Sequence, residues 1–168
     1  MKPMSESFGR LTKVSAVGWM AAAVLFVAEN IPALAGGNAR PFKAVGASNL
    51  TADPNDPSGA SGTFEVVGNA THLGNFFFPG TWKVVGVNAV GGYVYRVEGM
   101  YVAANGDTIK ILCPDWGIDD GANPEFSTGI VQIIGGTGRF ANASGSYKGS
   151  LSPVPGPTLF TAEGTISY

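Results

Sequence analysis

The sequence predicts an all-β fold, an antiparallel eight-stranded β-barrel, on three observations. Apolar and polar residues alternate with period two in several stretches, which is typical of half-buried strands. Eight such stretches are separated by Gly, Pro, Asn and Asp, and no gap between them holds a helical crossover of a dozen residues. Glycine supplies 25 of the 168 residues and proline 11, and only 13% of the residues are charged. This composition favours turns and close-packed strands over a helical bundle.

The amino terminus has the pattern of a secretory signal peptide. Lys2, Arg10 and Lys13 precede the uncharged run 16–28. These 13 residues match the apolar region of a signal peptide and fall short of the roughly 20 that span a bilayer. The triplet Ala33-Leu34-Ala35 then supplies the small-x-small pattern that a signal peptidase accepts.

We therefore expect a signal peptide over residues 1–35 and a single β-barrel domain over 36–168, with Gly36 as the first mature residue. The mature protein would be exported, to the periplasm or the extracellular space, with no membrane span left after cleavage. An uncleaved membrane anchor is the alternative.

Eight strands are expected along the rest of the chain. Alternation is clearest where Phe64, Val66 and Ala70 share one face and Thr63 and Glu65 the other. A tight hairpin is expected at Asn-Gly-Asp 105–107. In chain order the expected strands are 42–50, 63–72, 81–88, 93–104, 108–113, 127–135, 145–151 and 160–168.

A sandwich and a closed barrel both accommodate this number of strands. Glycine inside a strand costs stability unless it permits a bend, a bulge or a close approach, and these are what barrel closure requires. Internal glycines therefore favour the barrel; they stand at 68, 86, 99, 129, 149 and 164.

Polar loops are expected at 51–62 and 113–124, and a stiff one with three prolines at 152–157. The acids of the second loop do not follow the spacing of a calcium-binding loop. With one histidine and one cysteine in the chain, a conventional His/Cys zinc set is excluded. We therefore expect no metal and no cofactor. Cys113 is expected to be a buried small hydrophobe, and a disulfide between two chains is the alternative.

Three short motifs carry a resemblance to known families. Gly-Gly-Thr-Gly-Arg-Phe at 135–140 resembles a turn of the plant dirigent proteins and the allene oxide cyclases. Ala-Thr-His-Leu-Gly at 70–74 and Ala-Ala-Asn-Gly-Asp at 103–107 look more like a group of exported bacterial proteins of unknown activity. The resemblance implies an eight-stranded antiparallel barrel like that of the allene oxide cyclases. No helix follows the glycines of 135–140, so the sequence favours a structural turn over an anion cradle.

A candidate pocket follows from the alternation inside the predicted barrel. Several aromatic side chains and the single histidine have the apolar parity of their strands, whereas Arg96 and Glu98 have the opposite parity and are expected on the outside. An eight-stranded barrel is either just filled by side chains or holds one small ligand. His72 is interpreted as a hydrogen-bonded residue near a strand end or, alternatively, as a general base or a hydrogen-bond donor that orients a ligand. The candidate pocket residues are His72, Tyr95, Tyr101, Tyr147 and Phe160.

Three functions fit these observations. The formal net charge of −2 argues against a nucleic-acid partner. The first interpretation is an exported barrel without catalytic machinery that binds a small apolar ligand or a surface partner. The second is a cofactor-independent cyclase or isomerase acting on an apolar substrate in the barrel interior. The third is a structural envelope protein with a filled core.

Overall fold

The computed structural model describes residues 37–118, 127–153 and 155–168. The predicted signal peptide and its cleavage position before Gly36 lie outside the described residues. So do the loop acids Asp119, Asp120 and Glu125. Among the residues described, no helix is long and apolar enough to cross a membrane.

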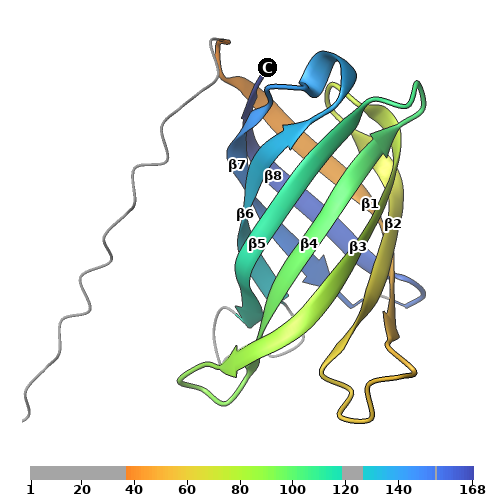
Figure 1. Cartoon of the computed structure of the whole chain (residues 1–168), viewed down its shortest axis with the longest axis vertical. Helices are drawn as coiled ribbons and strands as arrows, with labels where there is room; N and C mark the ends of the chain where they lie inside the picture. Colours follow the sequence, from red (N-terminus) through yellow and green to blue (C-terminus); the bar gives the residue numbers. More distant parts are fainter. Residues whose placement is uncertain (1–36, 119–126, 154) are drawn as a thin grey trace, which may run out of the picture. The chain divides into compact units, whose positions relative to one another are not determined.

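The described chain is a closed antiparallel barrel whose eight strands follow one another in sequence order, with β8 returning to pair with β1 (Figure 1). The predicted fold class is therefore confirmed. The strands are β1 (Arg40–Ala52), β2 (Ser61–Ala70), β3 (Gly74–Val87), β4 (Tyr93–Ala103), β5 (Thr108–Ile118), β6 (Ser127–Gly136), β7 (Ser144–Ser152) and β8 (Thr158–Ser167).

Two strands extend past prolines at which the sequence places a boundary. β3 begins at Gly74, before the expected 81, and contains Pro79. Its ladder with β4 has no paired position between Phe77 and Gly80, and a proline, which has no N–H, is tolerated where a ladder is interrupted. β5 continues through Pro114, which lies in a bulge between the pairs made by Cys113 and Trp116. The expected loop 113–124 is therefore wrong for its first six residues, which belong to β5.

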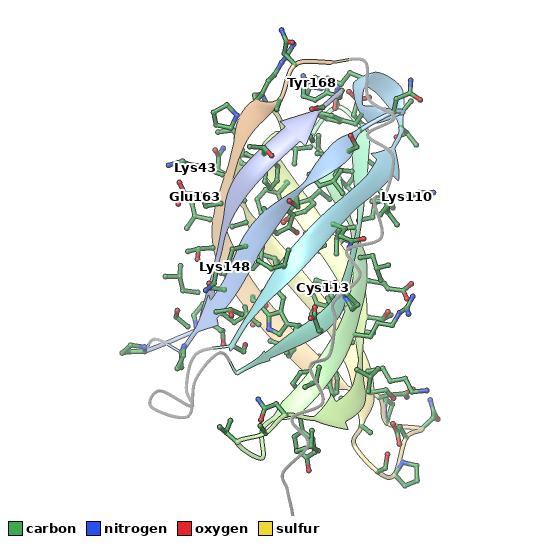
Figure 2. The ribbon with its side chains drawn as sticks, turned by 90° about the vertical axis from the view of Figure 1, so that its left-hand side faces the viewer. Lys43, Lys110, Cys113, Lys148, Glu163 and Tyr168 are labelled. Atoms are coloured by element: carbon green, nitrogen blue, oxygen red, sulfur yellow. The ribbon has the colours of Figure 1, made fainter. Side chains whose placement is uncertain are left out.

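An ion pair on the outer surface joins β1 and β8, the two strands that close the barrel. The Lys43 ammonium on β1 and the Glu163 carboxylate on β8 lie 2.8 Å apart across the seam (Figure 2). Both side chains are exposed. The hydrogen bond from Lys43 lowers the pKa of Glu163, so this carboxylate is charged at neutral pH.

The two ends of the barrel are built differently. One end carries the β2–β3 and β4–β5 turns and a short 3-10 helix, η1 (Gly138–Phe140), and we name it the closed end (Figure 1). The other end carries the β1–β2, β3–β4 and β7–β8 connections, and we name it the open end. Fully buried side chains pack the closed half of the barrel: Phe42, Ile109, Phe140 and Ile166.

The turn before η1 has the backbone that its glycines predict. Gly138 has a φ of +57°, a conformation that costs a residue with a Cβ about 1–2 kcal/mol. A Cβ at this position would also collide with the Asp107 carboxylate. That carboxylate pairs with Arg139 Nε at 3.2 Å, and Phe140 is fully buried behind them. The glycines of this motif therefore serve a turn.

Replacing Gly138 by valine is expected to destabilise the barrel by about 1–3 kcal/mol, because strain and collision act together at this position. Urea unfolding followed by circular dichroism measures the loss. Gly86→Ala is the matched control, since a Cβ there meets nothing within 4 Å. Equal stability of the Gly138→Val variant and the wild type would contradict the assignment of this turn.

Candidate functional site

The open half of the barrel contains a cavity of about 510 Å³. Its mouth lies at the open end, where Leu50, Gly91, Gly92 and Tyr93 contribute to its wall. Leu50 and Tyr93 are more than half exposed, whereas the residues deeper in the wall are buried. Because the closed half is packed, the described residues form a cup-shaped cavity whose entrance lies at the open end.

Aromatic side chains form much of the wall of this cup. They reach it from six strands because inward positions alternate along each strand and closure turns those positions toward one axis. Eight of the eighteen lining residues are aromatic: Phe64, Phe78, Trp82, Tyr93, Tyr95, Trp116, Tyr147 and Phe160.

Trp116 is positioned by a pair of glycines on the neighbouring strands. Gly129 and Gly149 are opposite each other in the β6–β7 ladder. A Cβ on Gly149 would lie 2.6 Å from Cζ3 of the Trp116 ring, and one on Gly129 would lie 2.9 Å from its Cε3. The indole N–H donates to Ser127 Oγ at 3.0 Å. The glycines thus make room for the ring, and Ser127 fixes its orientation.

Below the cavity lies a buried pair of tyrosines. Tyr147 lines the cavity, and its hydroxyl accepts a hydrogen bond from the Tyr101 hydroxyl at 2.8 Å. Tyr101 is fully buried and stacks on Phe78, with ring centroids 4.0 Å apart. Burial raises the pKa of both tyrosines well above their ordinary value. Both hydroxyls therefore stay neutral at any physiological pH.

The polar groups of the wall are few and uncharged. No Lys, Arg, Asp, Glu or His is among the lining residues that the structure describes. Ser48 is 3% exposed and lines the cavity, and its hydroxyl makes no hydrogen bond within the described ranges. Because Ser48 lines the cavity, its hydroxyl is available to a polar group of a bound molecule. Burial also raises the pKa of Tyr95.

The structure brings some of the candidate pocket residues together and separates others. Tyr95, Tyr147 and Phe160 line the same cavity. Tyr101 lies one layer deeper and supports Tyr147 without being part of the wall. The outward placement of Arg96 and Glu98 is confirmed, because both are exposed and paired at 2.7 Å.

The expected place of His72 in the pocket is wrong. β2 ends at Ala70, and His72 lies in the turn that follows, at the closed end, with a φ of +68°. Its Nε2 donates to the Pro41 carbonyl at 2.9 Å, and its ring contacts Tyr168. Alternation assigns a face only within a strand, so it does not extend to a residue in a left-handed turn. The hydrogen-bonded interpretation of His72 is the one that matches the structure.

Cys113 is a free, fully buried thiol on β5 (Figure 2). Burial raises the pKa of this thiol to about 11, so it is protonated at neutral pH. The interpretation of Cys113 as a small buried hydrophobe is confirmed. Within the residues described, no three His, Cys, Asp or Glu side chains are grouped as metal ligands, and Asp115 lies on β5.

Sequence reasoning missed several residues of the wall. Trp116 lies beyond Pro114, where the sequence suggests a loop. Trp82 continues the inward alternation of Phe76 and Phe78 on β3. The predicted strand begins only at residue 81, so it does not include the two phenylalanines that set this alternation. Ser48 was detectable as a polar side chain in the middle of β1 with the parity of Phe42 and Ala44.

The solved structures that are similar to this chain include two dirigent proteins. The pterocarpan synthase dirigent protein GePTS1 matches 78% of this chain and 90% of its own, with 14% identity and a TM-score of 0.46. The pterocarpan synthase dirigent protein PsPTS1 matches 78% and 94%, with 13% identity and a TM-score of 0.47. Both are dirigent proteins, one of the two families that the turn at 135–140 resembles. No protein-family model and no curated protein matches the chain.

Proposed function

We propose that the barrel binds one small, uncharged and predominantly apolar molecule in its cavity. The observation that carries this proposal is the cup itself, about 510 Å³ with eight aromatic side chains and no charged group in its wall. This volume is in the range of sites for small ligands, which are mostly apolar with a few placed polar groups. Side chains fill only the closed half of the interior. A structural envelope protein with a filled core would have no cavity in the open half, so the cavity favours ligand binding over that function.

The absence of charged groups among the described lining residues favours an uncharged ligand. Moving an ion from water into an apolar site costs several kcal/mol unless an opposite charge compensates it. The described lining residues offer hydroxyl groups and no such charge. We therefore assign an uncharged ligand, with its polar group directed to Ser48 or to the Tyr147 hydroxyl.

The polar groups of the cavity favour binding over acid–base catalysis. A general acid or base needs a pKa near the working pH and a place within reach of the substrate. His72 is at the other end of the barrel, and the pKa values of Tyr95 and Tyr147 are raised. These tyrosines orient a ligand through hydrogen bonds and keep their protons.

A titration with Nile red, an uncharged apolar dye, tests this function. We expect saturable binding of one dye per chain, with the blue-shifted emission of an apolar environment. Competition by other uncharged apolar compounds, and none by their charged analogues, would support the proposed selectivity. Binding that does not saturate, or that proceeds equally with charged analogues, would contradict it.

We further propose that the protein is exported and begins at Gly36 after cleavage. The support is the order of a positive segment, an uncharged run of signal-peptide length and the Ala33-Leu34-Ala35 triplet. Amino-terminal sequencing of the protein from culture medium or periplasm is expected to start at Gly36. A sequence that retains Trp19 would contradict cleavage.

A further inference from the structure

The hairpin that joins β3 and β4 carries an exposed apolar tip. Every residue in the range 84–95 is uncharged. Three large side chains at its end are well exposed: Val87 at 61%, Val90 at 61% and Tyr93 at 58%. An exposed cluster of this kind marks an interaction site more often than scattered single residues do.

Several backbone groups of this tip are hydrogen-bonded within the tip itself. The Asn88 side-chain oxygen accepts from the N–H groups of Val90 at 3.1 Å and Gly92 at 2.8 Å. The Asn88 N–H donates to the Gly92 carbonyl, and the Gly91 N–H donates to the Asn88 carbonyl. Because unsatisfied backbone groups make a loop costly in an apolar phase, these bonds lower the cost of moving this tip out of water.

Basic residues flank the apolar tip on both strands. Lys83 and Arg96 are direct partners in the β3–β4 ladder, one step outside the uncharged range. Arg96 pairs with Glu98, whereas Lys83 makes no ion pair within the described residues. The aspartates of the open end that the structure describes lie on other segments, at 53 and 56 in the β1–β2 loop and at 115 in β5. Asp53 and Glu98 line the same groove as Lys83 and Arg96. The hairpin therefore presents an apolar tip with one cation beside it, Lys83, that makes no ion pair within the described residues.

The same hairpin is continuous with the cavity. Its Gly91, Gly92 and Tyr93 form part of the cavity mouth. A row of rings then leads inward, with centroid distances of 6.4 Å from Tyr93 to Tyr95 and 5.8 Å from Tyr95 to Trp82. Tyr and Trp are the side chains enriched where proteins meet the membrane–water interface.

We propose that the β3–β4 tip docks onto a lipid bilayer that carries anionic headgroups. Val87, Val90 and Tyr93 enter the apolar layer, and Lys83 meets the headgroup charge. Docking in this way places the cavity mouth against the bilayer. An uncharged apolar ligand then moves between the bilayer and the cavity without crossing water. This second step rests on the proposed function, whereas the docking does not.

The test compares two labelled variants of the full chain. Val90→Cys and Ile134→Cys replace residues of similar exposure, 61% and 57%, the first at the tip and the second toward the closed end of β6. Each new cysteine is labelled with the environment-sensitive fluorophore NBD, while the buried thiol of Cys113 stays unlabelled. The amino-terminal apolar run is common to both variants, so a difference between them reports the position of the hairpin.

On vesicles of phosphatidylcholine with phosphatidylglycerol, we expect a severalfold rise and a blue shift of NBD emission at position 90 and little change at 134. Lys83→Ser should weaken this response severalfold on these vesicles and leave it unchanged on phosphatidylcholine alone. Equal responses at both positions, a response at 134 only, or none at 90 would overturn the proposal. Nile red binding in vesicle-free solution is measured separately, so failure of docking and failure of the cavity are distinguishable.

Discussion

Replacing Tyr101 by alanine is expected to lower the free energy of unfolding by about 3–5 kcal/mol, the range for removing a buried aromatic ring. Tyr101 is fully buried and contacts the rings of Phe42, Phe76 and Phe78. Its removal leaves a void that the closed strands of a barrel have little freedom to fill. Urea unfolding at neutral pH, with the slope of the transition compared between variants, measures this loss.

Tyr101→Phe is the matched control for this variant. It keeps the ring and removes only the hydroxyl, so Tyr147 loses its buried hydrogen-bond partner. That loss is expected to cost about 1–3 kcal/mol, less than the loss of the whole ring. A Tyr101→Ala variant that is as stable as Tyr101→Phe would contradict the placement of this ring in the core.

Replacing Leu151 by aspartate is expected to weaken binding of an uncharged apolar ligand by about 30- to 1000-fold at pH 7. Leu151 lines the cavity from the end of β7 and is partly buried. An aspartate there is hydrated in the empty cup, and a ligand that covers it strips that water, at a cost of about 2–4 kcal/mol. Titration with Nile red measures the affinity.

Leu151→Asn separates charge from size in this experiment, because its side chain is nearly isosteric with aspartate and neutral. We expect it to bind much more tightly than the aspartate variant. Glu98→Gln on the outer face and His72→Gln at the closed end should leave binding unchanged. Equal affinities of the Leu151→Asp and Leu151→Asn variants at pH 7 would contradict the assignment of Leu151 to the ligand site.

The effect of Leu151→Asp should also depend on pH in a defined direction. A covering ligand favours the neutral carboxyl, so the pKa of this group is higher in the complex than in the free protein. Affinity is therefore expected to rise as the pH falls toward about 4, the ordinary pKa of an aspartate, and to level off below it. Titrations across that range, with Leu151→Asn as the flat reference, measure this dependence.

The alternation of apolar residues predicted the strands and much of the interior, and the internal glycines favoured closing the strands into a barrel. Alternation also gave the face of the residues inside the strands. It placed Tyr95, Tyr147 and Phe160 on inward faces because each lies within a strand and not in a turn. The turn at Asn105-Gly106 was predicted from its residue types, because glycine readily adopts the positive φ that such turns require. Gly106 has a φ of +87° in the structure.

The rest depends on properties that alternation does not contain. His72 lies past the end of β2, and Trp116 lies beyond the bulge at Pro114, so parity misplaces the first and omits the second. Whether a barrel is hollow depends on how far its side chains reach across it. Here the hydroxyls of Tyr101 and Tyr147 meet inside the barrel and fill the space below the cavity. Gly129 and Gly149 have no side chain, so the Trp116 ring packs close to their strands and leaves the cavity open.

Native mass spectrometry of the protein purified gently from its own host measures whether the cavity holds a ligand. We expect a mass above that of the polypeptide by one small molecule per chain, removed by extraction with an apolar solvent and absent from the Leu151→Asp variant. A protein that carries the polypeptide mass alone, and that gains no mass when incubated with uncharged apolar compounds, would contradict a ligand-binding cavity.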